Sequence, residues 1–191
     1  MNFVQPIRDQ DVIDGIKEYL KLRSLRNYLF FCLGIYSGLR VSDLLSLKVG
    51  MVRSTHITLV EQKTHNKKNP KKKRFIIHPS IREDLDRFIA GKSDDEYLFV
   101  SRQIKTKSKL RGKPIGRSTA YKMLNDVARH FNLAEIGTHT LRKTWGYQLY
   151  MANPNNLALL MEMFNHENPL DTLRYIGYSQ DMMDAAISGM K

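Results

Sequence analysis

Three separated segments of the chain carry residue types that could bind and cleave a phosphodiester. They read GLRVSDLLSLK (38–48), THTLRKTWGYQL (138–149) and FNHENPLDTLRYIGYSQ (164–180). Arginine side chains bind phosphate oxygens through paired hydrogen bonds and stay charged at any accessible pH. A tyrosine hydroxyl can act as a nucleophile when a neighbouring base or a strongly positive site activates it. The third segment holds two tyrosines, Tyr175 and Tyr178, and either could be a nucleophile or a packing residue.

Each of these residues also has a purely structural interpretation. A single histidine such as His139 is more often a hydrogen-bonded residue near the core than a catalytic group, and Arg40 could be a surface ion-pair partner. Tyr175 could be a helix residue that packs against Leu170 and Leu173. Because each feature alone is weak, the order and spacing of all of them must decide.

The composition indicates a partner with many negative charges. The 191 residues include 31 Lys+Arg against 19 Asp+Glu, which gives a formal net charge of +12. Nucleic acid is the first expectation and an anionic membrane surface the second. No segment shows a basic helix face opposite a broad apolar one, which disfavours the membrane surface. A hydrophobic content of 42% suits one domain with a single core.

Neither membrane insertion nor secretion is supported by the sequence. The longest apolar run, residues 28–36, is far shorter than the roughly 18 residues of a spanning helix. The N-terminal MNFVQPIRDQ lacks the apolar core and cleavage site of a secretory signal, so a cytoplasmic protein is expected. Cys32, the single cysteine, lies within the apolar run and is interpreted as a core residue. One cysteine excludes a disulfide framework and a cysteine-based zinc site.

Hydrophobic spacing predicts a mostly helical fold. Residues 9–22 have the stripe of an amphipathic helix, and residues 27–36 suit a buried helix that ends at Gly38. Ser42 or Asp43 would cap a short helix after that turn. Further helices are predicted at residues 79–90, 117–131, 138–151, 156–164 and 179–191.

The sequence also predicts one small antiparallel sheet. Residues 56–62 and 74–79 are short β-branched segments on either side of a basic turn, 63–73. Residues 101–114 are polar and basic without a period, so we expect a surface loop there. The expected fold class is therefore mostly α with a small antiparallel β-sheet, that is, α+β.

The order and spacing of the three segments resemble the tyrosine recombinase family, the phage-type integrases. Gly38-Leu39-Arg40 matches the arginine box of that family, and His139-Thr140-Leu141-Arg142 matches its His-x-x-Arg box. In the third box the family places a histidine nine residues before its nucleophilic tyrosine, as His166 precedes Tyr175 here. Tyr178 lies three residues beyond the position of the nucleophile in that spacing and is interpreted as a packing residue.

This resemblance implies the catalytic-domain fold of the tyrosine recombinases and their chemistry on DNA. Arg40, Arg142 and His166 would bind the scissile phosphate, and His139 with the arginines would activate Tyr175. The tyrosine would form a 3′-phosphotyrosine link and release a 5′-hydroxyl, and a 5′-hydroxyl of another strand would reseal the DNA without ATP. No metal and no other cofactor is implied.

The family also carries a lysine, the general acid, on a β-hairpin between the first two boxes. Lys63 fits this lysine best because it directly follows the first predicted strand, and a different turn would place Lys67 or Lys68 there. The cations of the two basic segments are predicted to contact DNA phosphates. They are Lys67, Lys68, Lys71, Lys72, Lys73, Arg74, Lys105, Lys107, Lys109 and Arg111.

The resemblance further implies that residues 1–191 form a single catalytic domain, without the separate N-terminal DNA-clamping domain of most relatives. The expected partner is double-stranded DNA, bound by a homo-tetramer on paired sites that the C-terminal segment links. One departure is Asn165, which stands where the family usually has glycine before its second histidine. Asparagine is also tolerant of the left-handed turn expected there.

Two other functions share parts of this pattern. A type IB topoisomerase uses the same nucleophile chemistry but relaxes supercoils without joining different duplexes. A DNA-binding regulator could keep the fold and lose catalysis. The complete set of matched arginines, histidines and tyrosine favours a site-specific recombinase over that regulator.

Overall fold

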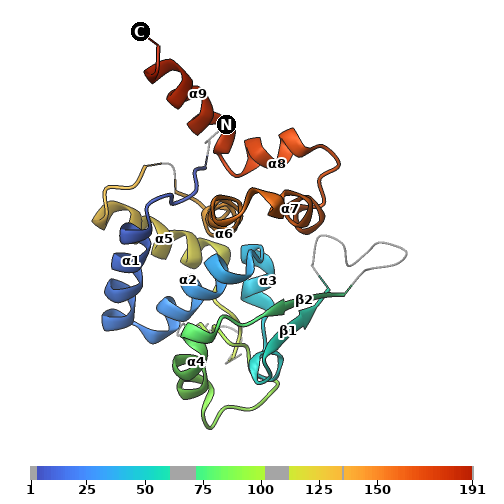
Figure 1. Ribbon diagram of the computed structural model, residues 1–191. Helices are drawn as coiled ribbons and strands as arrows, with labels where there is room; N and C mark the ends of the chain where they lie inside the picture. The colour runs from blue at the N-terminus through green and yellow to red at the C-terminus, as the bar shows by residue number, and fades with distance from the viewer. Residues whose placement is uncertain (1–3, 61–71, 102–111, 135, 191) are drawn as a thin grey trace.

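The computed structural model describes residues 4–60, 72–101, 112–134 and 136–190. The helices of this part are α1 (Gln10–Arg23), α2 (Leu25–Ser37), α3 (Val41–Ser46), α4 (Arg82–Ile89), α5 (Arg117–His130), α6 (Thr140–Ala152), α7 (Leu157–Phe164), α8 (Pro169–Tyr175) and α9 (Tyr178–Ser188) (Figure 1). Strands β1 (His56–Leu59) and β2 (Lys73–Ile76) pair antiparallel, with His56 opposite Ile76. The predicted class, mostly α with one small antiparallel sheet, is confirmed.

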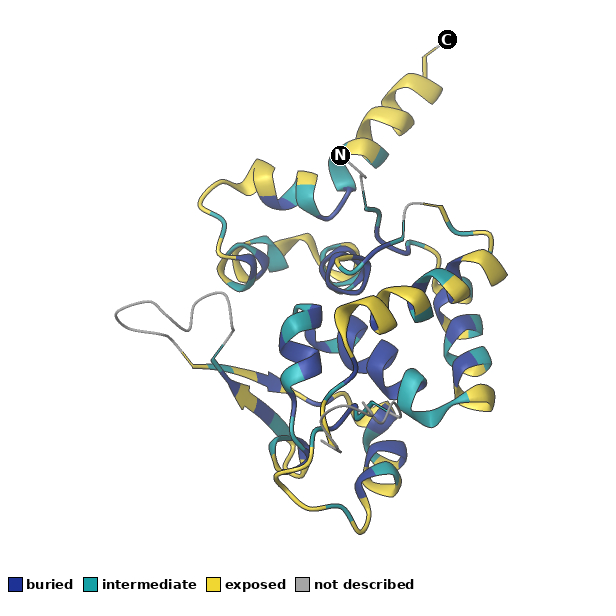
Figure 2. Cartoon of the chain, turned by 180° about the vertical axis from the view of Figure 1, so that it is seen from behind, coloured by how far each residue is buried: buried dark blue, intermediate teal, exposed yellow. Residues whose placement is uncertain are grey.

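Helix α2 forms the centre of the main hydrophobic core. Phe30, Phe31 and Cys32 are fully buried in it, which confirms the interpretation of the cysteine as a core residue. Figure 2 shows most of α2 in dark blue. Helix α6 lies directly against α2, because a Cβ atom on Gly34 would overlap the side chain of Leu141. The close contact places the two arginine boxes, one after α2 and one on α6, beside each other.

A second, smaller cluster holds the C-terminal helices on α6. Its buried members are Tyr147, Leu160, Phe164 and Ile176, from α6, α7 and the end of α8. Tyr175 packs against this cluster. Since α6 contributes to both clusters, it is the element that connects the region of the first arginine box to the helix that carries Tyr175 (Figure 1).

Local signals explain how the segment before Tyr175 folds. Asn165 adopts the left-handed conformation with φ 62°, as expected, and ends α7. Helix α8 was not predicted. Its start is marked by Asn168, whose side chain accepts a hydrogen bond from the backbone N–H of Leu170, and by Pro169 at the first helical position.

The prediction that Ser42 or Asp43 is the N-cap of α3 was wrong. Helix α3 begins at Val41, so Ser42 and Asp43 lie inside its first turn, and the N-cap is Arg40 with no side-chain cap. The reason is the left-handed Gly38 at the end of α2, with φ 63°. It turns the chain so sharply that the next helix starts after only two residues.

We expect Gly38→Ala to destabilise the protein far more than Gly91→Ala. Both glycines have a positive φ, 63° and 72°, so each alanine adds a left-handed strain of about 1–2 kcal/mol. Only at Gly38 would the new methyl group also overlap the Trp145 ring, whereas no atom lies within 4 Å at Gly91. Overpacking adds about 1–3 kcal/mol. Urea unfolding of the two variants measures the difference, and equal midpoints would contradict the Trp145 contact.

Candidate active site

Arg40 lines a small cavity. It is the half-buried N-cap residue of α3, held by the turn at Gly38. The cavity has a volume of about 70 Å³ and is lined by Arg40, Val41, Ser42, Arg117, Thr138 and His139. Two arginines and a histidine around one small polar space form a site suited to a phosphate group.

Arg142 is buried and positioned by backbone carbonyls from two other elements. The residue is 2% exposed. Its Nη1 donates to the Gly38 carbonyl at 2.5 Å, and its Nη2 donates to the Met163 carbonyl at 2.8 Å. The guanidinium carbon lies 4.9 Å from the centre of the Phe164 ring. Arg142 therefore connects the end of α2, the end of α7 and the helix α6 on which it lies.

The structure brings His139 and Tyr175 together. His139 is the N-cap residue of α6, one helical turn before Arg142, and Tyr175 is the last residue of α8. The Tyr175 hydroxyl lies 3.3 Å from Nδ1 of His139, within hydrogen-bonding distance. The tyrosine ring is also 4.8 Å from the ring of Phe164 and 5.4 Å from that of His166, measured between centres. Packing thus fixes the ring, and the hydroxyl points to a base.

Burial and the nearby positive charges shift the pKa values of these two groups. Although His139 as a residue is exposed, partial burial of its ring and the positive charges of Arg142, Arg40, Lys143 and Arg117 lower its pKa below 6.5. The imidazole is therefore neutral at pH 7 and able to accept a proton. Burial raises the pKa of Tyr175, and the charges of Arg142 and Arg40 counteract part of this effect. Ionisation of the Tyr175 hydroxyl at neutral pH would therefore require a proton acceptor.

His166 is oriented by a buried threonine. Its Nδ1 lies 3.0 Å from Oγ1 of Thr172, a residue of α8 that is fully buried. The same helix ends at Tyr175, so α8 fixes the histidine and the tyrosine relative to each other. Tyr178 instead packs against Tyr150 with their rings 4.7 Å apart, as expected for a packing residue.

Two cations near the site were not predicted as functional residues. Arg117, the first residue of α5, lines the small cavity with Arg40. Lys143 is buried on α6, and its Nζ lies 5.2 Å from the centre of the Tyr175 ring. Lys143 directly follows the His-x-x-Arg box, which could have drawn attention to it. Arg117 carried no such signal, since only the fold brings the start of α5 to Arg40.

The predicted DNA contacts are only partly described by the structure. Outside the described residues lie Lys63, predicted as the general acid, and the predicted DNA contacts Lys67, Lys68, Lys71, Lys105, Lys107, Lys109 and Arg111. Lys72 and Arg74 are exposed at the start of β2, where cations can reach a phosphate backbone. Lys73 between them is half-buried, and its Nζ donates to the Met163 carbonyl at 2.9 Å.

None of the helices in the described ranges is long and apolar enough to span a bilayer. Within the same ranges, no three or more His, Cys, Asp or Glu side chains form a group that could hold a metal ion.

Comparison with known proteins identifies the family. The sequence profile of the phage integrase family matches residues 8–181. The probable integrase/recombinase YoeC of Bacillus subtilis (strain 168) is 39% identical over 187 residues, which cover 97% of this chain and 96% of that protein.

Solved structures support the same fold. The XerH site-specific recombinase, in a post-cleavage complex with a palindromic difH substrate, aligns with a TM-score of 0.67 at 18% identity. The alignment covers 98% of this chain and 54% of that one, so the chain spans about half the length of XerH. The catalytic domain of bacteriophage HP1 integrase aligns with a TM-score of 0.58 at 18% identity, over 98% of this chain and 95% of that domain. The chain belongs to the phage integrase family of tyrosine recombinases.

Proposed function

We propose that the protein is a site-specific DNA recombinase or integrase that cleaves and rejoins strands through a 3′-phosphotyrosine intermediate. The observation that carries the proposal is the placement of the Tyr175 hydroxyl 3.3 Å from His139, beside a cavity lined by Arg40. A nucleophile, its base and a phosphate-binding arginine are therefore adjacent before DNA arrives. The net charge of +12 supports a DNA substrate, and we place the reaction in the cytoplasm.

In the proposed reaction each residue acts on one phosphate. Arg40 and Arg142 bind its non-bridging oxygens, where negative charge grows in the transition state. His139 accepts the proton as the Tyr175 oxygen attacks phosphorus, and His166, fixed by Thr172, hydrogen-bonds the phosphate. The new bond joins phosphorus to the phenolic oxygen, and the bond from phosphorus to the 5′-oxygen breaks.

A lysine completes this scheme. The departing 5′-oxygen needs a proton, and we propose Lys63 as the donor, with Lys67 and Lys68 as the alternatives. Because arginine and lysine provide the positive charge, we expect the enzyme to work in the presence of a chelator. Attack of a 5′-hydroxyl on the phosphotyrosine reverses the step and needs no nucleotide cofactor.

The covalent adduct tests the proposal directly. The protein is incubated, in a chelating buffer, with a library of nicked duplexes randomised around the nick, so that the short cleaved strand diffuses away and trapping is irreversible. We expect a protein–DNA complex that survives denaturant, with the DNA attached to the peptide that contains Tyr175. An adduct on a residue other than tyrosine, or none with any duplex, would refute the proposed function, whereas an adduct on another tyrosine would refute only the role of Tyr175.

Strand exchange also requires the assembly of several protomers on DNA, and the exposure of α9 supports a role of this helix in that assembly. This helix extends away from the body of the protein (Figure 2) and leaves Ile187 66% exposed, and Met190 just after the helix is 78% exposed. We propose that residues 1–191 act as a catalytic domain that forms a homo-tetramer on paired DNA sites through α9. Ile187→Glu should abolish the tetramer in sedimentation on paired sites while adduct formation on one site persists. A variant that still forms tetramers would exclude this role of α9.

The topoisomerase alternative makes a different product. A recombinase joins strands from two duplexes that carry the target site, whereas a type IB topoisomerase only relaxes a supercoiled plasmid. Plasmids with two target sites distinguish them, because exchange gives recombinant circles of new sizes. Relaxation without any recombinant product would favour the topoisomerase.

As the pH is lowered, we expect the rate of adduct formation to fall only below pH 6.5. Partial burial and its cationic neighbours lower the pKa of His139, so its base form persists to a pH below the ordinary histidine value. Arg117→Gln removes one of these charges and should move the acid limb upward towards pH 6.5. Arg129→Gln, exposed on the same helix, is the matched control. Single-turnover rates from pH 5 to 8 measure the acid limb of the pH–rate profile. A limb above pH 6.5 would contradict the assignment of His139 as the base.

A further inference from the structure

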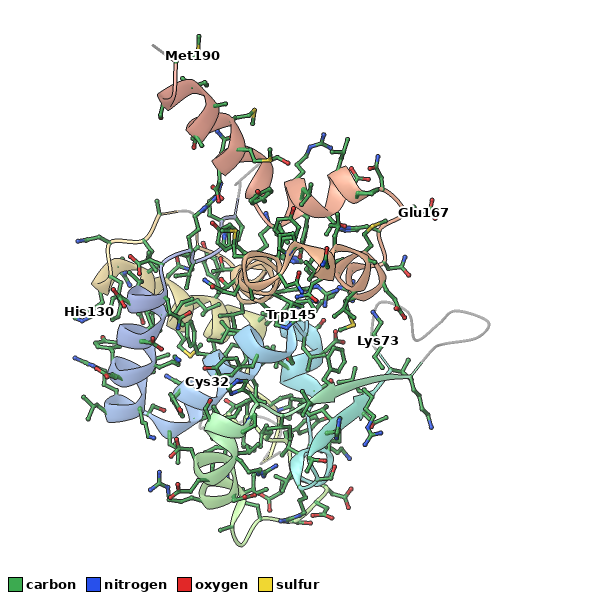
Figure 3. All side chains as sticks on the ribbon, in the orientation of Figure 1. Cys32, Lys73, His130, Trp145, Glu167 and Met190 are labelled. Carbon is green, nitrogen blue, oxygen red and sulfur yellow. The ribbon has the colours of Figure 1, made fainter. Side chains whose placement is uncertain are left out.

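The side chain of Lys73 holds the C-terminal end of α7. Its Nζ donates to the Met163 carbonyl at 2.9 Å, and Nη2 of Arg142 donates to the same oxygen at 2.8 Å. Figure 3 shows Lys73 at the start of β2, at the end of the sheet nearest α7. The sheet, α6 and α7 therefore meet at one carbonyl oxygen.

This carbonyl belongs to the turn that leads to His166. The last four backbone carbonyls of an α-helix accept no hydrogen bond from an N–H group of the same helix. In α7, the carbonyls of Met161 and Glu162 accept hydrogen bonds from the backbone N–H groups of His166 and Asn165. The next carbonyl, that of Met163, accepts from the two cations, whose charge also suits the negative end of the helix dipole. The turn before His166 is thus fixed from both sides.

Lys73 connects this turn to the segment that precedes β2. That segment, residues 61–71, carries the proposed proton donor, and the turn leads to His166 and then to Tyr175. An in-line displacement requires the attacking oxygen and the proton donor on opposite sides of one phosphorus atom. A displacement of either group by about 1 Å can cost on the order of 10²-fold in rate.

We propose, building on the proposed function, that Lys73 is a positioning residue that sets the β1–β2 hairpin and the α7–α8 segment relative to each other. It acts through the Met163 carbonyl and does not donate the proton to the leaving oxygen. The neighbouring Lys72 and Arg74 remain available to bind DNA phosphates.

A bridging phosphorothiolate substrate separates positioning from proton donation. In this duplex sulfur replaces the 5′-oxygen at the scissile phosphate, and attack by Tyr175 breaks the P–S bond and releases a thiolate that needs no proton. A variant that lacks the general acid is therefore rescued by sulfur, and a mispositioned site is not. For Lys73→Met we expect adduct formation to slow by on the order of tenfold on both substrates. Lys73→Arg, which keeps a charged donor, should restore the rate.

Lys72→Met is the matched control, since it removes an adjacent but exposed cation. It should lower DNA affinity and its salt dependence with little change in the rate at saturating DNA. Rescue of Lys73→Met by sulfur would make Lys73 the general acid and overturn the proposal. Equal rates of adduct formation by Lys73→Met and Lys72→Met at saturating DNA would also overturn the proposal. Lys73 would then be a DNA phosphate contact like Lys72.

Hydrogen exchange tests the same contact without DNA, and so independently of the proposed function. The amides of Asn165 and His166 should exchange on the order of tenfold faster in Lys73→Met than in Lys72→Met, because the Met163 carbonyl in this turn loses one of its two donors. Amides of α2 report global stability and should exchange equally in both. Unchanged exchange at Asn165 and His166 would overturn the positioning role even if no DNA substrate is found.

Discussion

Tyr175→Phe is expected to lower covalent adduct formation by at least about 10⁴-fold, the size of effect seen when an enzyme loses its nucleophile. The substitution removes one oxygen atom and the 3.3 Å contact with His139. The ring keeps its packing against Phe164, so the fold and DNA affinity should remain. A denaturing gel with the nicked duplex measures the adduct, and fluorescence anisotropy measures binding.

The matched control for this substitution is Tyr178→Phe. Tyr178 lies at the start of α9 and its ring contacts Tyr150, away from His139. Loss of its hydroxyl should leave adduct formation within a few-fold of the unmodified protein. If Tyr175→Phe still formed the adduct and Tyr178→Phe did not, the nucleophile would be Tyr178.

Arg142→Lys is expected to lower the cleavage rate by about 10²–10³-fold, although the positive charge is kept. The guanidinium reaches the carbonyls of Gly38 and Met163 with two different nitrogens. A lysine has one nitrogen and cannot reproduce this planar fork together with a contact to phosphate. The variant should also be less stable, because a buried carbonyl loses its donor. Single-turnover cleavage and urea unfolding measure the two effects.

Arg174→Lys provides the comparison on the surface. Arg174 is exposed on α8, beside Tyr175 in sequence, and pairs with Asp171 at 3.3 Å. Such exposed pairs contribute about 0–1 kcal/mol, so neither rate nor stability should change much. A cleavage rate for Arg142→Lys as high as that for Arg174→Lys would show that Arg142 does not bind the transition state.

Much of the fold was predictable because its signals are local. Helix α2 follows from a continuous apolar run that ends in a glycine, and the left-handed Asn165 follows from a side chain that tolerates this conformation. Helix α8 was missed because it is short and mostly exposed, so it shows little hydrophobic period. Its Asn168-Pro169 start was visible in the sequence and would have predicted it.

The family and the residues proposed to react were also contained in the sequence. The spacing within the His-x-x-Arg box places His139 and Arg142 one helical turn apart, and this is a local property of the backbone. The match of the family profile to residues 8–181 confirmed the resemblance drawn from these boxes.

The sequence by itself therefore determined the family, the helical class and the residues proposed to react, because these depend on short-range order along the chain. Only the tertiary structure decided which groups touch. The 3.3 Å contact of Tyr175 with His139, and the meeting of Lys73 and Arg142 at Met163, join positions far apart in sequence. Such contacts depend on how α6 packs between two hydrophobic clusters, and no local pattern encodes that packing.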